Sequence, residues 1–466
     1  MWGVAILTAV AAVLLAYYLL KPKAPNIPAL TLTQGLRLAF SKDTHLLLAE
    51  FANHHGPIFQ IKNPDGGVRM LVVTDPPAAK IAMKSEVKGS FYDPFKRFHA
   101  PVLFLGEGDW WRKQRRITSP VFSGSSVRAL HGIMVEETQN LFNALDAKPK
   151  GTPFDADDLF CRLTLDVIGR TIYGESFDAL SGREVAVQAA LAEGLLEIQK
   201  RISNPLRNYY TKGTQRLVEN IYGWKAIEKR RAMENWEEIN DLLTILLTSV
   251  DSETGEKMPD EQIARELGAF IAAGHETSAH TLAWTLYHML QNPDVTERCR
   301  TEVDEVMEGR SFPTHEDLKK MKQLDLIMKE SMRLTPVSPM GSARDLNADA
   351  EICGFAVPKG TSVWVPFYPL FTDAKLWEDP MAFKPERFLD ISSSDPKYMP
   401  FSAGPRNCLG KAMAELELQI VLAGLLRNYT FRLTPDAKVE GALEITLKPR
   451  GLMVLFERRP ATVSDA

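Results

Sequence analysis

One stretch near the middle of this 466-residue chain constrains the fold more than any other. After Pro259, a residue suited to the first turn of a helix, apolar residues recur with helical spacing until Asn292-Pro293 interrupts the pattern. About thirty residues at about 1.5 Å each give a helix of roughly 45 Å, which is long enough to cross a whole domain. The pattern therefore predicts a large domain in which helices dominate.

Other helical patterns extend from about Glu107 to Leu334, with β signals on both sides of them. Residues 58–73 contain an Asp-Gly turn between two apolar runs, which predicts a hairpin. A second extended patch, residues 352–367, alternates β-branched residues with Pro and Gly. Since no internal repeat or second flexible linker divides the remainder, we expect one mainly α-helical domain with small β-sheets over residues 35–466.

The first twenty residues contain no charged side chain, and Lys21 follows them directly. An apolar run of this length spans about 28 Å, close to the thickness of a bilayer's hydrocarbon core. Because positive charge stands only after the run, a retained anchor is favoured over a cleaved signal peptide or a buried core helix. We expect a transmembrane anchor at 1–20, a Pro-rich linker at 21–34 and a cytosolic catalytic domain.

The composition excludes several classes of protein. With 55 Lys and Arg against 59 Asp and Glu, the net charge of −4 gives no reason to expect nucleic acid as a partner. The four cysteines lie far apart and form no CxxC pair, which argues against a disulfide scaffold and a zinc ribbon. What remains is a large globular protein.

Cys408 stands in a loop rich in Gly and Pro, which runs from Phe401 to Gly410 and leads into an amphipathic helix. A helix N-terminus lowers the pKa of a nearby thiol and favours the thiolate. Gly404 and Gly410 would let a flat ligand approach the backbone, and Arg406 could pair with an anionic group on it. A lone cysteine here could also be a buried free thiol. The loop, however, fits the pattern FxxGxRxCxG and resembles the haem-binding loop of the cytochrome P450 family.

Two further motifs occur in the order that this family has. Glu330-x-x-Arg333 matches the family's ExxR motif on a helix that must stop before Pro336, and Pro385 to Phe388 resembles its PERF element. In the family, these residues form a buried network behind the haem loop. The resemblance therefore implies a structural role for Glu330, Arg333 and Arg387.

The resemblance covers about residues 35–460 and implies haem b, with the Cys408 thiolate as axial iron ligand. Residues 108–116 fit the family's GxxWxxxRR motif. Trp111, Arg115 and Arg344 are then implied ligands of the haem propionates.

The middle of the long helix contains His275, Glu276 and Thr277. The next imidazole, His280, follows at i+5 and points about 140° away from His275, so the two are not expected to share zinc. The stretch instead resembles the family's AGx(D/E)T(T/S) signature, which implies that Glu276 and Thr277 are catalytic and deliver protons during oxygen activation. A Thr277 hydroxyl bonded back to the Ala273 carbonyl is the structural alternative.

The resemblance also implies an apolar substrate pocket and thus a lipophilic substrate: a fatty acid, a sterol, a terpenoid or a xenobiotic. Each implied pocket residue could equally belong to the core. These residues are Phe98, Phe104, Leu105, Ala269, Ala273, Val337 and Met340.

Electrons must come from another protein, because the chain has no dinucleotide-binding motif and no room for a flavin domain. A flavoprotein reductase that uses NADPH, or cytochrome b5, is therefore implied, in the endoplasmic reticulum membrane. Arg112, Lys113 and Lys411 would form its basic docking site unless they are simply solvated charges. A reductase-independent peroxide isomerase or dehydratase, and a non-catalytic haem sensor, remain as alternatives; the Glu276-Thr277 pair favours the monooxygenase.

Overall fold

The computed structural model describes residues 27–62, 68–96, 101–183, 223–239, 241–392 and 394–460, with scattered residues between 185 and 200. The predicted anchor at 1–20 and residues 21–26 of the predicted linker lie outside these ranges. Within the described ranges, no helix combines the length and the apolar character that a membrane span requires.

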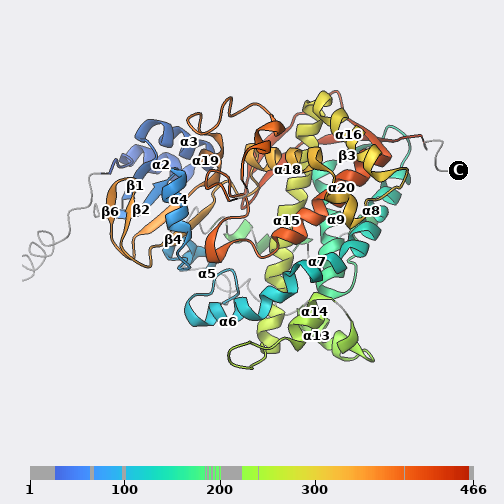
Figure 1. Cartoon of the computed structure of the whole chain (residues 1–466), viewed down its shortest axis with the longest axis horizontal. Helices are drawn as coiled ribbons and strands as arrows, with labels where there is room; N and C mark the ends of the chain where they lie inside the picture. Colours follow the sequence, from blue (N-terminus) through green and yellow to red (C-terminus); the bar gives the residue numbers. More distant parts are fainter. Residues whose placement is uncertain are drawn as a thin grey trace, which may run out of the picture.

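The predicted long helix is α15 (Asp260–Gln291), which runs through the centre of the molecule (Figure 1). Its 32 residues correspond to about 48 Å. Pro259 is its N-cap, one position before the predicted place, and Asn292 follows its last turn. The helix is buried along most of its length, so it forms the axis on which the other helices pack.

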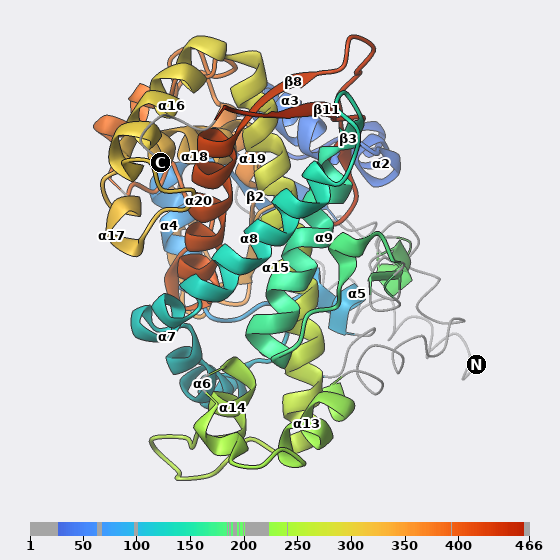
Figure 2. The ribbon, with the colours of Figure 1, turned by 90° about the vertical axis from the view of Figure 1, so that its right-hand side faces the viewer.

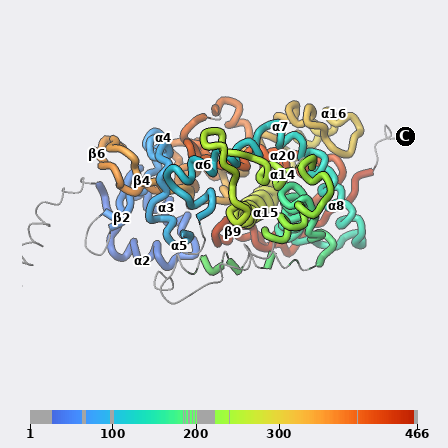
Figure 3. Tube along the Cα trace, turned by 90° about the horizontal axis from the view of Figure 1, so that it is seen from below, coloured from blue at the N-terminus to red at the C-terminus, as the bar shows by residue number. Residues whose placement is uncertain are grey.

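Helices from distant parts of the chain cover this axis, and α8, α9, α15 and α20 lie side by side in Figure 2. The helices before α15 are α2 (Leu32–Phe40), α3 (Thr44–His55), α4 (Pro76–Met83), α5 (Asp93–Lys96), α6 (Gly108–Thr118), α7 (Gly124–Ala129), α8 (His131–Asp146), α9 (Ala156–Ile168), α13 (Trp224–Arg231) and α14 (Leu242–Thr248). Those after it are α16 (Pro293–Met307), α17 (His315–Leu318), α18 (Lys322–Leu334), α19 (Phe367–Thr372) and α20 (Lys411–Asn428). Seen from below, α14 lies beside the N-terminal end of α15 (Figure 3).

The largest sheet among the described residues has the strand order β1-β2-β7-β4. Its strands are β1 (Ile58–Lys62), β2 (Val68–Val73), β4 (Ser342–Asp345) and β7 (Ser362–Val365). The antiparallel pairing of Ile58 with Val73 confirms the predicted hairpin. The neighbouring β2 and β7 run parallel, which joins the N-terminal hairpin to a segment almost 300 residues further along the chain.

The remaining strands form small sheets. They are β3 (Pro153–Asp155), β8 (Tyr429–Leu433) and β11 (Met453–Arg458) in one sheet, and the pairs β5 (Ala350–Ile352) with β6 (Phe355–Val357) and β9 (Glu440–Leu443) with β10 (Leu447–Arg450). The fold is thus mainly helical with small sheets, as the sequence predicts.

Candidate functional site

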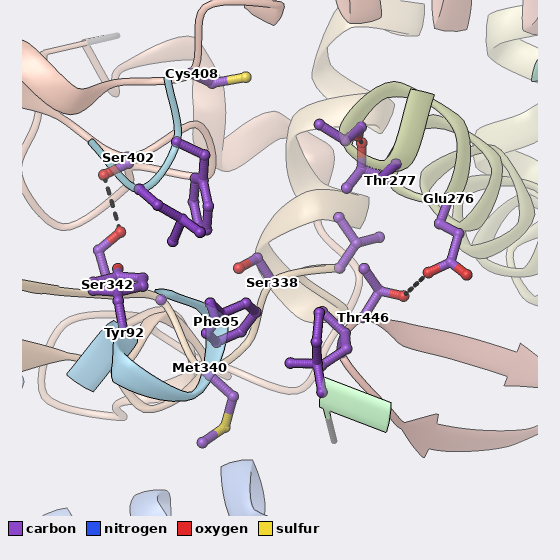
Figure 4. Close-up of a pocket in the computed structure, with 18 of the residues that line it drawn as sticks. Tyr92, Phe95, Glu276, Thr277, Ser338, Met340, Ser342, Ser402, Cys408 and Thr446 are labelled. Atoms are coloured by element: carbon purple, nitrogen blue, oxygen red, sulfur yellow. Dashed lines mark hydrogen bonds between the residues drawn. The ribbon is translucent and has the colours of Figure 1, made fainter. Parts of the chain in front are cut away.

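A cavity of about 1540 Å³ lies between α15, the loop before α20 and the segment 101–105. Cys408 and Thr277 stand on facing walls, with the Cys408 sulfur directed toward α15 (Figure 4). Ala273 is exposed although it lies in the middle of the central helix, because its side chain faces this space. A flat ligand of considerable size therefore has room between a thiol and the midpoint of α15.

The walls of the cavity include most of the residues that the sequence predicts for a substrate pocket. Phe104 is 51% exposed, an unusual state for a large aromatic residue, because its ring borders the cavity. Phe98 lies outside the described residues. The predicted pocket residues found on the wall are Phe104, Leu105, Ala269, Ala273, Val337 and Met340.

The Cys408 loop is closed by a backbone hydrogen bond of 2.8 Å from the Cys408 amide to the Phe401 carbonyl. The accessible surface of the thiol faces the cavity, and protein atoms surround the rest. In this setting burial raises the pKa of the Cys408 thiol, although the Gly410 N–H and the Arg115 guanidinium oppose the rise. The sequence prediction of a lowered thiol pKa is therefore wrong for the chain alone, because desolvation outweighs the helix N-terminus.

A buried cluster of cations adjoins the cavity. Lys88 lies over the ring of Phe104 at 3.6 Å, and burial together with Arg344 and Arg406 holds its pKa well below its usual range. Burial and Arg344 likewise lower the pKa of Arg406 to about 10. The Arg344 Nε is buried and makes no hydrogen bond to the described residues. Crowded cations with an unpartnered donor fit the carboxylates of a dianionic ligand such as haem.

Arg406, the loop residue predicted to pair with an anionic group of the ligand, also has partners in the protein itself. Arg406 donates to three backbone carbonyls, those of Glu86, Leu103 and Gly106, at 2.8, 3.4 and 2.6 Å. Its guanidinium also lies 3.8 Å from the ring centre of Trp111. Arg406 thus braces the cavity wall in addition to carrying charge.

Arg115 and Arg344 take different positions relative to the cavity. Arg115 borders it and donates to the Asn407 side chain at 2.9 Å. Arg344 is fully buried behind the wall, where it donates to the Ala343 carbonyl at 2.7 Å and contacts the Tyr92 hydroxyl. Only Arg115 of this pair faces the cavity directly.

The two loop glycines have different surroundings. Gly404 has a φ of +69°, and a Cβ there would lie 2.0 Å from the Met83 carbonyl oxygen. The approach of α4 therefore requires a glycine here, independently of any ligand. A Cβ at Gly410 would meet open space, and Gly410 borders the cavity.

Glu276 and Thr277 lie on the cavity face of α15. The Thr277 hydroxyl donates to the Ala273 carbonyl at 2.6 Å, which is the back-bonded geometry that the sequence left as the alternative. The Glu276 carboxylate accepts a hydrogen bond of 3.1 Å from Thr446, a residue just before β10 (Figure 4). No pattern in the sequence points to Thr446, because it meets Glu276 only through the tertiary fold.

Behind the loop lies the buried network of Glu330, Arg333 and Arg387. The Glu330 carboxylate is fully buried and accepts from Arg333 at 2.7 and 2.8 Å and from Arg387 at 3.0 Å. Arg333 also donates to the carbonyls of Phe371 and Pro380 at 2.8 Å each. The three charges therefore connect α18 to the segments that precede the loop.

Two buried carboxyl groups near the cavity escape sequence analysis. Glu266 on α15 accepts hydrogen bonds from the Leu103 amide, and burial raises its pKa to about 7. Glu417 on α20 borders the cavity beside Ser278, and burial raises its pKa to about 8. Both stand in helical patterns where a Glu is usually read as a solvated residue.

The predicted basic docking residues all have acidic partners in their own chain. Arg112 contacts Glu86, Lys113 contacts Glu256, and the Lys411 Nζ lies 3.8 Å from Glu415. Any docking protein would therefore compete with these ion pairs, which weakens the predicted attraction.

Comparisons with known proteins identify the family. The family model described as Cytochrome P450 matches residues 22–456. The chain is 28% identical to cytochrome P450 3A5 of Homo sapiens in an alignment 429 positions long, which covers 86% of this chain and 85% of that protein. It is 30% identical to cytochrome P450 3A14 of Cavia porcellus, over 82% of this chain and 83% of that protein. It is 29% identical to Protein LUTEIN DEFICIENT 5, chloroplastic, of Arabidopsis thaliana, over 82% of this chain and 68% of that protein. The chain therefore belongs to the cytochrome P450 family of haem-thiolate monooxygenases.

Proposed function

We propose that this monooxygenase inserts one oxygen atom of O₂ into a lipophilic small molecule, with electrons supplied by a separate reductase. The observation that carries the proposal is the pairing of Cys408 with Glu276-Thr277 across a cavity whose other residues are largely apolar. Phe104, Leu105, Val337 and Met340 favour an apolar ligand and disfavour a strongly hydrated one.

When bound, the haem supplies the activation of O₂, which a thiolate ligand promotes. Cys408 would hold the iron. Arg115, Arg406 and the buried Arg344 would supply positive charge for the propionates, and the Trp111 indole N–H would be a neutral donor beside them. Delivery of protons is assigned to side chains on α15.

Proton delivery is assigned to Glu276 and Thr277. The Glu276 carboxylate is held by Thr446 at the cavity edge, so it can exchange a proton with cavity water. The Thr277 oxygen can still accept a hydrogen bond while its O–H donates to the Ala273 carbonyl. Thr277 would thus orient a water in the cavity, and Glu276 would replace the proton that this water gives up.

The reductase partner follows from the absence of any dinucleotide-binding motif in the sequence. We place its dock near Arg112, Lys113 and Lys411, whose own-chain carboxylate partners must be displaced or shared. Residues 1–20 are proposed as the membrane anchor, with residues 21–34 as linker and residues 35–466 as the catalytic domain on the cytosolic side of the endoplasmic reticulum.

The haem ligand is tested by spectroscopy of the reduced protein with carbon monoxide. We expect absorption far to the red of a histidine-ligated haem, and loss of this band in Cys408→Ser. Cys299→Ser is the matched control, because Cys299 is a buried thiol on α16 and outside the cavity wall. A normal band in Cys408→Ser would refute the ligand assignment.

The reaction class is tested with O₂ plus a reductase, against a lipid hydroperoxide without reductase. Product only from the hydroperoxide would support the isomerase reading instead. Thr277→Ala should uncouple NADPH consumption from product formation. Thr281→Ala, which loses the same kind of back-bond one turn later, should uncouple far less. A spectral-shift screen of fatty acids, sterols, terpenoids and xenobiotics would then identify the substrate class.

A further inference from the structure

A second group of metal-ligating side chains lies between α9 and α15 and consists of Asp157, Cys161 and His280. One ligand atom of each residue lies within 4.8 Å of those of the other two. The His280 Nδ1 is 2.6 Å from an Asp157 carboxylate oxygen. Asp157 and Cys161 are one turn apart on α9 and share a face, while His280 reaches them from α15.

The two helices that hold this cluster are fixed relative to each other. They form the most extensive helix–helix contact of the described residues, and the Thr164 hydroxyl donates to the His275 carbonyl at 3.0 Å. Cys161 and His280 are 9% and 3% exposed, whereas Asp157 is less buried. The cluster is therefore preformed on rigid elements and has one member near the surface, through which an ion could enter.

The surroundings of the cluster are rich in negative charge. Besides Asp157, the carboxylates of Asp158 and Glu276 act electrostatically on the Cys161 thiol, and Lys448 opposes them. Asp158 is itself paired with Arg162 at 2.7 Å. Lys448 is itself paired with Glu444 at 2.9 Å. A cation placed among these groups would gain electrostatic energy.

A second imidazole in the same region lacks good partners. His275 is 3% exposed, and neither ring nitrogen forms a well-aligned hydrogen bond to the described residues, although the ring lies near the Cys161 carbonyl. His275 is thus a buried imidazole close to the cluster but not a member of it.

We propose that Asp157, Cys161 and His280 bind a zinc ion, at a site separate from the haem. One oxygen, one sulfur and one nitrogen ligand suit Zn²⁺ better than Mg²⁺ or Ca²⁺, which prefer oxygen alone. Metal–ligand bonds of about 2.0 to 2.3 Å place tetrahedral ligand atoms about 3.3 to 3.8 Å apart, so modest side-chain rotations are sufficient. Binding releases the Cys161 thiol proton to solvent, and a water occupies the fourth position.

This site differs from the pairing of His275 with His280 that helical geometry excludes. The partners of His280, Asp157 and Cys161, lie on α9. The metal would therefore link α9 to α15 one turn after the Glu276-Thr277 pair. The consequence is mechanical: the ion would stabilise the part of α15 that borders the cavity.

Metal analysis of the purified holoprotein tests the proposal. After mild chelation and reloading with zinc, we expect about one zinc per haem iron. Cys161→Ser and His280→Gln should each weaken zinc binding at least about tenfold. Cys299→Ser is the control, because it removes an equally buried thiol on another helix, and it should bind zinc as the parent protein does. The carbon monoxide band reports whether each variant is folded.

X-ray absorption at the zinc edge needs no variant and is not obscured by haem. We expect one sulfur at about 2.3 Å and nitrogen or oxygen neighbours at about 2.0 to 2.2 Å. Three results would overturn the site: zinc well below one per iron after loading, zinc without a sulfur neighbour, or unchanged affinity in folded Cys161→Ser. Each result is independent of monooxygenase activity.

Discussion

Glu266 tests whether burial raises the pKa of a carboxyl group in this protein and thereby makes its stability depend on pH. Its carboxylate is fully buried on α15 and accepts from the Leu103 amide at 2.9 and 3.0 Å and from Gln262 at 2.7 Å. It thus holds the cavity segment 101–105 on the central helix. Burial raises its pKa from 4.5 to about 7, which outweighs these hydrogen bonds.

The substitution Glu266→Gln removes the titration and keeps the size of the side chain. Between pH 4.5 and about 7, the folded chain holds a proton that the unfolded chain has lost. Unfolding then releases a proton, so the free energy of unfolding declines as the pH rises through this window. Below the window, Glu266 is protonated in both states and its titration does not change the free energy of unfolding. The difference between the two pKa values corresponds to about 3 kcal/mol lost above pH 7.

Chemical unfolding followed by circular dichroism, at about pH 5 and about pH 8, measures this effect. Relative to the parent protein, Glu266→Gln should gain less than about 1 kcal/mol near pH 5 and about 3 kcal/mol near pH 8. Glu261→Gln is the control on the same helix, because the Glu261 carboxylate is 65% exposed and should show no such trend. A difference between Glu266→Gln and parent that does not change with pH would refute the reasoning.

Three further substitutions test the surroundings of the Cys408 loop. Arg333→Lys leaves Glu330 incompletely paired, so it should cost about 3 to 5 kcal/mol of unfolding free energy and most of the haem-loaded yield. Gly404→Ala should lower that yield strongly through strain and collision with a backbone carbonyl, whereas Gly410→Ala should not. Trp111→Phe should cost about 0.5 to 2 kcal/mol, measured by unfolding, by weakening the contact with the Arg406 guanidinium.

A specific result would contradict each of these expectations. Arg298→Lys alters a surface pair with Glu386, and an equal cost there would show that Arg333 has no special role. Equal yields for the alanine variants of the two loop glycines would contradict the steric argument. An unchanged unfolding free energy in Trp111→Phe would contradict the stacking argument.

Local signals in the sequence predict the helices and the hairpin well. The apolar spacing of α15, the stop of α18 before Pro336 and the pairing of β1 with β2 depend on residues close in the sequence, so local patterns contain the information. The six described pocket residues also lie on the cavity wall. Their identification depended on the family resemblance, since periodicity alone cannot separate pocket from core.

Contacts between distant segments explain what the sequence leaves open. Arg406 donates to the carbonyl of Glu86, 320 positions earlier, and Gly404 is required by the approach of Met83. The desolvation of the Cys408 thiol likewise depends on atoms from many segments. No local pattern encodes such contacts, which is why the bracing contacts of Arg406, the steric requirement at Gly404 and the direction of the thiol pKa were not predicted.

The central helix also limits which kinds of mutation this protein tolerates. Three side chains of this one continuous helix make contacts in different places. Glu266 holds the Leu103 amide, Thr277 lies on the cavity face, and His280 contacts α9. Each added or removed residue turns everything beyond it by about 100° and shifts it by about 1.5 Å. A single insertion between Glu266 and Thr277 would therefore rotate and shift Thr277 relative to Glu266 and to the segment 101–105 that Glu266 holds. This displacement is the same whatever residue is inserted. Along this stretch, we expect changes of length to be rejected, because one inserted residue displaces Thr277 and His280 together relative to Glu266.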